Sequence, residues 1–74
     1  MIEVGQKWEH LKRGHQYEIL DTDAAMQIAP ERVGAHRARQ LEAMAFVAYR
    51  RVGEARIFFR PADEFLDGRF RRVE

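Results

Sequence analysis

Apolar side chains recur along this chain in five short stretches with the spacing of β-strands. Glycines or turn dipeptides bound these stretches, and aromatic and β-branched residues are frequent within them, as is typical of short strands in a β-rich domain. The five predicted strands are Lys7–Lys12, His15–Leu20, Ala45–Arg50, Arg56–Arg60 and Arg69–Val73. The second can extend as far as Ile28 after a bend at residues 21–23, so the pattern predicts a mainly β fold.

Residues 61–68 predict a single helical turn between the last two strands. Pro61 suits a first helical position because its missing N–H is not needed there, and Asp63 and Glu64 favour the positive end of the turn. Strands, a hairpin, a short helical turn and a closing strand follow one another in the order of an SH3-like barrel. We therefore expect a small five-stranded SH3-like barrel or a strongly bent antiparallel sheet.

The reversal into the last strand is predicted at Gly68, between two phenylalanines. Glycine accepts a positive φ without steric cost, so we expect that conformation at Gly68. A helical turn that feeds a closing strand must be anchored at each end. We therefore expect Phe65 and Phe70 to be largely buried.

Residues 26–44 interrupt the strand pattern between the second and third strands. Pro30 and Glu31 can open a helix there, but Gly34 and the basic residues after it break the apolar pattern. We predict a long insertion that contains a short helix. A connection of this length is unusual in so small a domain, so we expect it to be either partly mobile or functional.

Both faces of the third and fourth strands are apolar. Phe46 and Ala48 alternate with Val47 and Tyr49, whereas a half-solvated antiparallel strand has a polar residue at every second position. The core covers one face. The other cover is either the insertion 26–44, which we favour slightly, or a second copy of the chain, so both a monomer and a homodimer are expected forms.

The composition fits a single domain over residues 1–74. With 46% hydrophobic residues, these 74 residues can build one core. The chain has no cysteine, which suits the reducing cytoplasm. No apolar run approaches the roughly 20 residues of a membrane span, and residues 1–4 lack the layout of a signal peptide. We expect a cytoplasmic protein with no membrane partner.

The basic residues are mainly arginine, although the net charge is only +1. Seven arginines lie in the last third of the chain: Arg50, Arg51, Arg56, Arg60, Arg69, Arg71 and Arg72. Because the guanidinium fork fits carboxylates, phosphates and aromatic faces, they can form an anion-binding face. The favoured interpretation is that nearby acids pair with most of them at the surface.

Catalytic and metal-binding patterns are not found. The three histidines, His10, His15 and His36, have no spacing typical of metal ligands. There is no serine and no cysteine, Thr22 is the single threonine, and so a covalent nucleophile has no obvious candidate. A small hydrolase or transferase would need a deep pocket that brings a histidine and a carboxylate together. We expect no enzyme, no metal and no cofactor.

Six aromatic and basic side chains are the candidate binding residues: Trp8, His10, Tyr17, Tyr49, Arg60 and Arg69. The ring of Trp8, Tyr17 or Tyr49 carries a polar atom that tolerates partial exposure, although aromatic residues on strands more often belong to the core. Arg60 either stands beside a binding groove or forms local ion pairs. We favour the second reading, with Asp63, Glu64 or Asp67 as its partner.

Three motifs resemble a bacterial and phage family. They are Trp8-x-His10-x-Lys12-Arg13-Gly14-x-x-Tyr17-Glu18, Val47-x-Tyr49-Arg50 and Arg60-Pro61-x-x-Glu64-Phe65-x-Asp67-Gly68-Arg69-Phe70. On these residues the chain resembles the domain-of-unknown-function 1653 family and similar short prophage-type proteins, over nearly its whole length except 26–44. The resemblance implies a compact β-rich domain of bacterial or phage origin, and no assigned activity. Six residues of the last motif are expected to have a structural role: Pro61, Glu64, Phe65, Asp67, Gly68 and Phe70.

These observations together favour a non-enzymatic accessory module that binds a protein or a peptide through an Arg-rich, aromatic-containing face. The alternative is a small barrel that binds nucleic acid through the same arginines and exposed aromatic rings. Binding that weakens strongly with added salt would favour nucleic acid.

Overall fold

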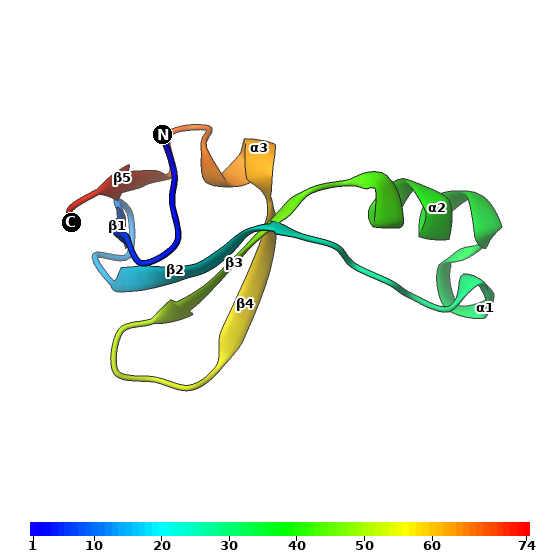
Figure 1. Cartoon of the computed structure of the whole chain (residues 1–74), viewed down its shortest axis with the longest axis horizontal. Helices are drawn as coiled ribbons and strands as arrows, with labels where there is room; N and C mark the ends of the chain where they lie inside the picture. Colours follow the sequence, from blue (N-terminus) through cyan, green and yellow to red (C-terminus); the bar gives the residue numbers. More distant parts are fainter.

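Five antiparallel strands form one sheet in the computed structural model, which describes residues 1–74 (Figure 1). The strands are β1 (Lys7–His10), β2 (Gln16–Ala24), β3 (Phe46–Arg51), β4 (Ile57–Pro61) and β5 (Phe70–Arg72). Their order in the sheet is β4-β3-β2-β1-β5. The prediction of a mainly β fold with five strands is confirmed. The edge strands β4 and β5 do not pair with each other, so the sheet is not closed.

The sheet is irregular along β2, its longest strand. The register of β2 against β3 shifts between Ile19 and Asp21, and again between Asp21 and Ala24. Such bulges bend a strand and increase its local twist. The bend predicted at residues 21–23 therefore lies within the strand, which ends at Ala24 and not at Leu20.

One face of the sheet, called here the inner face, carries the hydrophobic core. Alternation along β2 and β3 brings four of its residues to that face, and α3 and β5 supply the other two. The six members are Tyr17, Ile19, Val47, Tyr49, Phe65 and Phe70. Phe65 is fully buried and Phe70 is 6% exposed, so the prediction that both are largely buried is confirmed.

The predicted helical turn is the short helix α3 (Ala62–Phe65), which lies between β4 and β5. Pro61 ends β4 and stands just before the helix, one position earlier than predicted, with an extended ψ of 139°. Gly68 has a φ of 105°, which confirms the predicted reversal. Phe65 and Phe70, on either side of it, stack with ring centroids 4.2 Å apart.

The insertion forms two helices that project away from the sheet (Figure 1). These are α1 (Pro30–Val33), which begins at the predicted proline, and α2 (Ala35–Ala43), whereas a single short helix was predicted in the insertion. Gly34, with a φ of 88°, makes the sharp break between them. The two helices contact each other more than either of them contacts any strand. None of the three helices of the fold combines the length and the apolar character needed to cross a membrane.

The outer face of β4 is open, which the sequence did not predict. Phe46 and Ala48 of β3 are buried, but Ile57 and Phe59 of β4 are 51% and 53% exposed. Helices α1 and α2 do not cover them, because both helices extend beyond the sheet (Figure 1). Only the segment before α1 reaches this side, where Met26 and Phe59 line a shallow depression. The expectation that the insertion covers this face is therefore wrong.

Candidate functional site

A small pocket opens on the inner face, between the two edge strands. We call it the edge pocket, and its volume is about 80 Å³. Seven residues line it: His10, Arg13, Tyr17, Tyr49, Phe58, Arg60 and Phe70. A pocket of this volume has room for a small group such as a carboxylate.

Tyrosine and phenylalanine rings form the floor and walls of the edge pocket; Tyr17, Tyr49 and Phe70 also belong to the core, and Phe58 does not. Tyr17 and Tyr49 meet edge to face at 5.3 Å, and Phe58 stacks on Tyr49 at 5.8 Å. Tyr17 and Tyr49 are only 7% and 5% exposed. The favoured interpretation, that these rings belong to the core, is therefore confirmed for both, and the alternative of partial exposure is wrong. Packed rings of this kind give the pocket walls that move little and exclude water.

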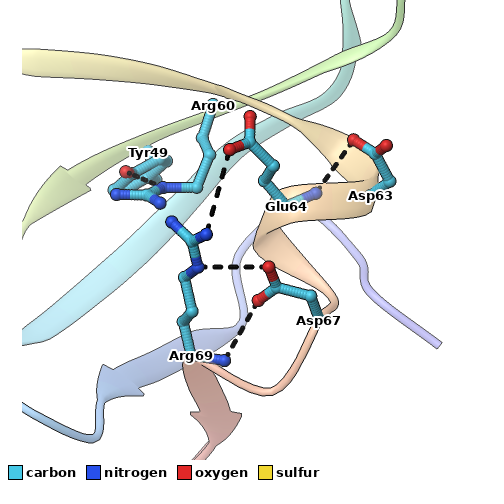
Figure 2. A network of polar contacts seen from close by, with 6 residues as sticks. All are labelled: Tyr49, Arg60, Asp63, Glu64, Asp67 and Arg69. Carbon is cyan, nitrogen blue, oxygen red and sulfur yellow. Dashed lines mark hydrogen bonds and ion pairs between the residues drawn. The ribbon is translucent and has the colours of Figure 1, made fainter.

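Arg60 reaches into the edge pocket from β4. Its Nε donates a hydrogen bond to Tyr49 Oη at 3.2 Å (Figure 2), and its guanidinium lies over the ring of Phe70, 5.4 Å from the centroid. No carboxylate lies within 4.0 Å of Arg60. The predicted ion pair with Asp63, Glu64 or Asp67 is therefore wrong, since Arg60 lies opposite Val47 in the sheet and points to the inner face.

Arg69 takes the acidic partners expected for Arg60. Its Nε lies 3.1 Å from Asp67 Oδ2 and its Nη2 lies 4.0 Å from Glu64 Oε1 (Figure 2). The backbone N–H of Arg69 also donates to Asp67 Oδ1 at 3.3 Å, while Asp63 accepts a hydrogen bond from the N–H of Glu64. Arg69 thus joins α3 to the start of β5 and does not line the edge pocket.

His10 closes the edge pocket on the side of β1. It lies opposite Phe70 in the sheet, and the two rings meet edge to face at 4.9 Å. Its Nδ1 accepts a hydrogen bond from the backbone N–H of Arg13 at 3.2 Å. Partial burial lowers the pKa of His10 below 6.5, and nearby positive charges lower this pKa further: Arg13, Arg60, Arg69 and Lys12. The imidazole is therefore neutral at pH 7, in an electropositive surrounding.

Trp8 lies away from the edge pocket. Its Nε1–H donates to Gln6 Oε1 at 3.0 Å, and its ring meets Phe65 edge to face at 5.5 Å. This contact places Trp8 against the part of the core that α3 supplies. Of the predicted binding residues, the structure brings four together and leaves out Trp8 and Arg69.

Of the three other lining residues, Phe70 was predicted only as a buried structural residue, and Phe58 and Arg13 were missed from the sequence. Phe58 stands two positions before Arg60, and residues at this spacing on a strand share a face, so the alternation of β4 contained the signal. Arg13 belongs to the turn after β1, where no periodic pattern applies. Both residues add to the same chemistry, an aromatic surface with positive charge beside it.

The arrangement is suited to holding an anionic group. Four of the seven arginines in the last third of the chain form ion pairs, namely Arg50, Arg51, Arg69 and Arg71. The two arginines of the edge pocket, Arg13 and Arg60, have no carboxylate partner. No group of three or more histidine or carboxylate side chains is placed to hold a metal ion.

Comparison of the chain with protein-family models, with curated proteins and with solved structures finds no match. The resemblance to the domain-of-unknown-function 1653 family therefore stays a prediction.

Proposed function

We propose that this chain is a non-enzymatic protein-binding module, and that the edge pocket receives an acidic side chain or a terminal carboxylate of its partner. The observation that carries the proposal is Arg60, which is half buried and has no carboxylate partner. Its Nε is used by Tyr49, which fixes the guanidinium and leaves its other nitrogens free to donate. A guanidinium fork presented in this way fits a carboxylate with two parallel hydrogen bonds.

The walls of the edge pocket strengthen such a contact. Apolar rings exclude water, and an ion pair gains more where the surrounding dielectric is lower. Arg13 adds a second positive charge at the pocket, and His10, neutral at pH 7, adds a polar ring that needs no counter-ion. An acidic group therefore finds both a positive field and fixed donors, whereas a cationic group finds neither.

The order of the elements supports a binding module of the small-barrel type. Strand order β4-β3-β2-β1-β5, with a short helix between β4 and β5, is the order expected of an SH3-like barrel. In our proposal the sheet is an open form of such a barrel, and the pocket lies where the barrel would close. Proteins of this architecture bind peptides in aromatic-lined grooves.

Nucleic-acid binding is the second candidate. One observation favours it: Arg56 and Arg60, on either side of the 38% exposed Phe58, lack acidic partners and can contact phosphate groups. The charge distribution is less favourable for nucleic acid, because binding to a phosphate backbone needs many free cations. Most arginines of the last third form ion pairs with acidic residues of the chain. A peptide partner therefore agrees better with the charge distribution.

The test uses peptides selected from a random displayed library with the protein as bait. We expect the selected peptides to contain a carboxylate, and we expect Arg60→Gln to weaken their binding about tenfold, which corresponds to about 1.4 kcal/mol. The matched control is Arg72→Gln, which removes one equally unpaired charge from an exposed residue outside the edge pocket. Equal losses in both variants, with a steep dependence on salt, would contradict the proposal and favour nucleic acid.

A further inference from the structure

The edge of β4 is an exposed, apolar strand with no neighbour. β4 pairs with β3 on one side only, so the other side of its backbone offers N–H and C=O groups to any strand that approaches. Its first three residues, Ile57, Phe58 and Phe59, are 51%, 38% and 53% exposed. Three consecutive large apolar residues at this exposure are uncommon on the edge strand of a monomer.

The opposite edge shows how this sheet protects a strand. β5 has only three residues, two of which are arginines, and Arg71 forms an ion pair with Glu9 on the neighbouring strand. Short length and charge are the common devices that prevent edge pairing. β4 has charge only at its margins, at Arg56 just before it and at Arg60 near its end. The two edges are therefore built differently, and β4 is the one left open.

We infer that β4 binds an extended segment of another protein as an added strand, and that this segment has apolar residues in its middle and a carboxylate toward each end. Arg56 and Arg60 flank the apolar residues and have no carboxylate within 4.0 Å. In a pair of strands, opposite charges on facing residues stabilise and like charges destabilise. The inference rests on the proposed function for the class of partner, a protein, and shares only Arg60 with the edge pocket.

A second copy of this chain fits the free edge of β4 less well than an acidic partner segment does. Two copies of β4 that pair antiparallel about Phe58 bring Ile57 opposite Phe59 of the other copy, which matches the apolar residues. The same register brings Arg56 opposite Arg60 of the other copy, at both ends of the contact. Like charges facing each other in this way oppose self-association. An acidic partner turns the same two positions into attractive contacts.

The experiment uses a synthetic peptide of alternating valine and threonine with a glutamate at each end, and a control peptide that ends in lysines. Backbone amide resonances of the isotope-labelled protein are followed during titration. We expect the glutamate peptide to shift the resonances of β4 and to slow hydrogen exchange of its outward amides. Arg56→Glu should weaken binding of this peptide about threefold to tenfold, by loss of attraction and gain of repulsion. The same variant should bind a peptide with one glutamate replaced by lysine more tightly than the wild type does.

The outcomes separate this inference from the proposed function. Binding that is lost in Arg60→Gln, unchanged in Arg56→Glu and seen only at resonances of the edge pocket would overturn the inference and leave the pocket proposal standing. No binding of the glutamate peptide at all would also overturn the inference. So would a free protein that sediments as a dimer with the amides of β4 already protected, since a second copy would then occupy the edge. The control Arg72→Glu, on β5, should change none of these measurements.

Discussion

Replacing Phe65 by alanine should remove a large share of the stability of this domain. Phe65 is fully buried and is supplied by α3, a helix of four residues. Its ring stacks on Phe70 at 4.2 Å and meets Tyr49 and Trp8 edge to face at 5.2 and 5.5 Å. The substitution therefore removes the contact that holds α3 on the sheet, together with three ring contacts in the core.

The expected loss in the free energy of unfolding is about 3 to 5 kcal/mol, the usual cost of truncating a buried phenylalanine. The loss lies at the upper end of that range if the three neighbouring rings leave a cavity, and each lost ring pair adds about 0.5 to 1.5 kcal/mol beyond its burial. A domain of this length has a total stability of about 4 to 11 kcal/mol. The variant should thus lose from about a quarter to all of the stability of the domain.

Urea denaturation followed by circular dichroism measures this change. The fluorescence of Trp8, the single tryptophan, gives a second signal from the same part of the core. Leu66→Ala is the matched control, because Leu66 is the next residue in the chain and is 51% exposed. We expect the control to lose less than about 1 kcal/mol. Similar losses in the two variants would refute the assignment of Phe65 to the core.

Three further predictions test the reversal, the insertion and the titration of the edge pocket. Gly68→Val should cost about 1 to 3 kcal/mol, since its φ of 105° strains a β-branched residue, and a melting temperature equal to the wild type would contradict this. Replacing residues 25–45 by an Asn-Gly turn should leave the sheet folded, because Ala24 and Phe46 are already paired across β2 and β3; loss of strand signal in circular dichroism would contradict it. The lowered pKa of His10 means that the unfolded chain binds a proton more readily, so stability should fall as the pH falls below 6.5. A His10→Asn variant should lose less stability over that interval in urea denaturation, and an equal loss would show that other groups are responsible.

The strands could be predicted because each one carries large apolar residues and ends at a glycine or a turn. Helix α2 could not, for a physical reason. A helix is recognised in a sequence by the apolar stripe that it buries, and α2 has one buried residue, Ala38. Its alanines, arginines and glutamate favour a helix through intrinsic propensity alone. The pattern of apolar residues therefore contained no signal for it.

The edge pocket was predicted in part. His10, Tyr17, Tyr49 and Arg60 were named because polar aromatic and basic side chains are typical of binding faces, and the fold brings all four together. The partner of Arg60 was predicted wrongly, because nearness in sequence suggested a local ion pair. Strand alternation turns the side chain of Arg60 to the inner face. The acidic residues Glu64 and Asp67 instead form ion pairs with Arg69, which comes later in the chain. Contacts between residues that are brought together only by the fold cannot be predicted from a single sequence.

The pairing of β1 with β5 also determines how the domain responds to force. The backbone N–H of Lys7 donates to the carbonyl of Glu74 at 2.8 Å, and the N–H of Val73 donates to the carbonyl of Lys7 at 2.8 Å. The start of β1 and the end of β5 therefore lie side by side, and the chain just before β1 is bonded to β2 through Gly5 and Gln6, which both contact the backbone of Ile19. Tension between the two ends of an antiparallel pair arranged in this way acts on one hydrogen bond after another and never on all of them together. We expect the domain to open at low force when it is stretched from its ends, even though the same strands resist heat and denaturant as a unit.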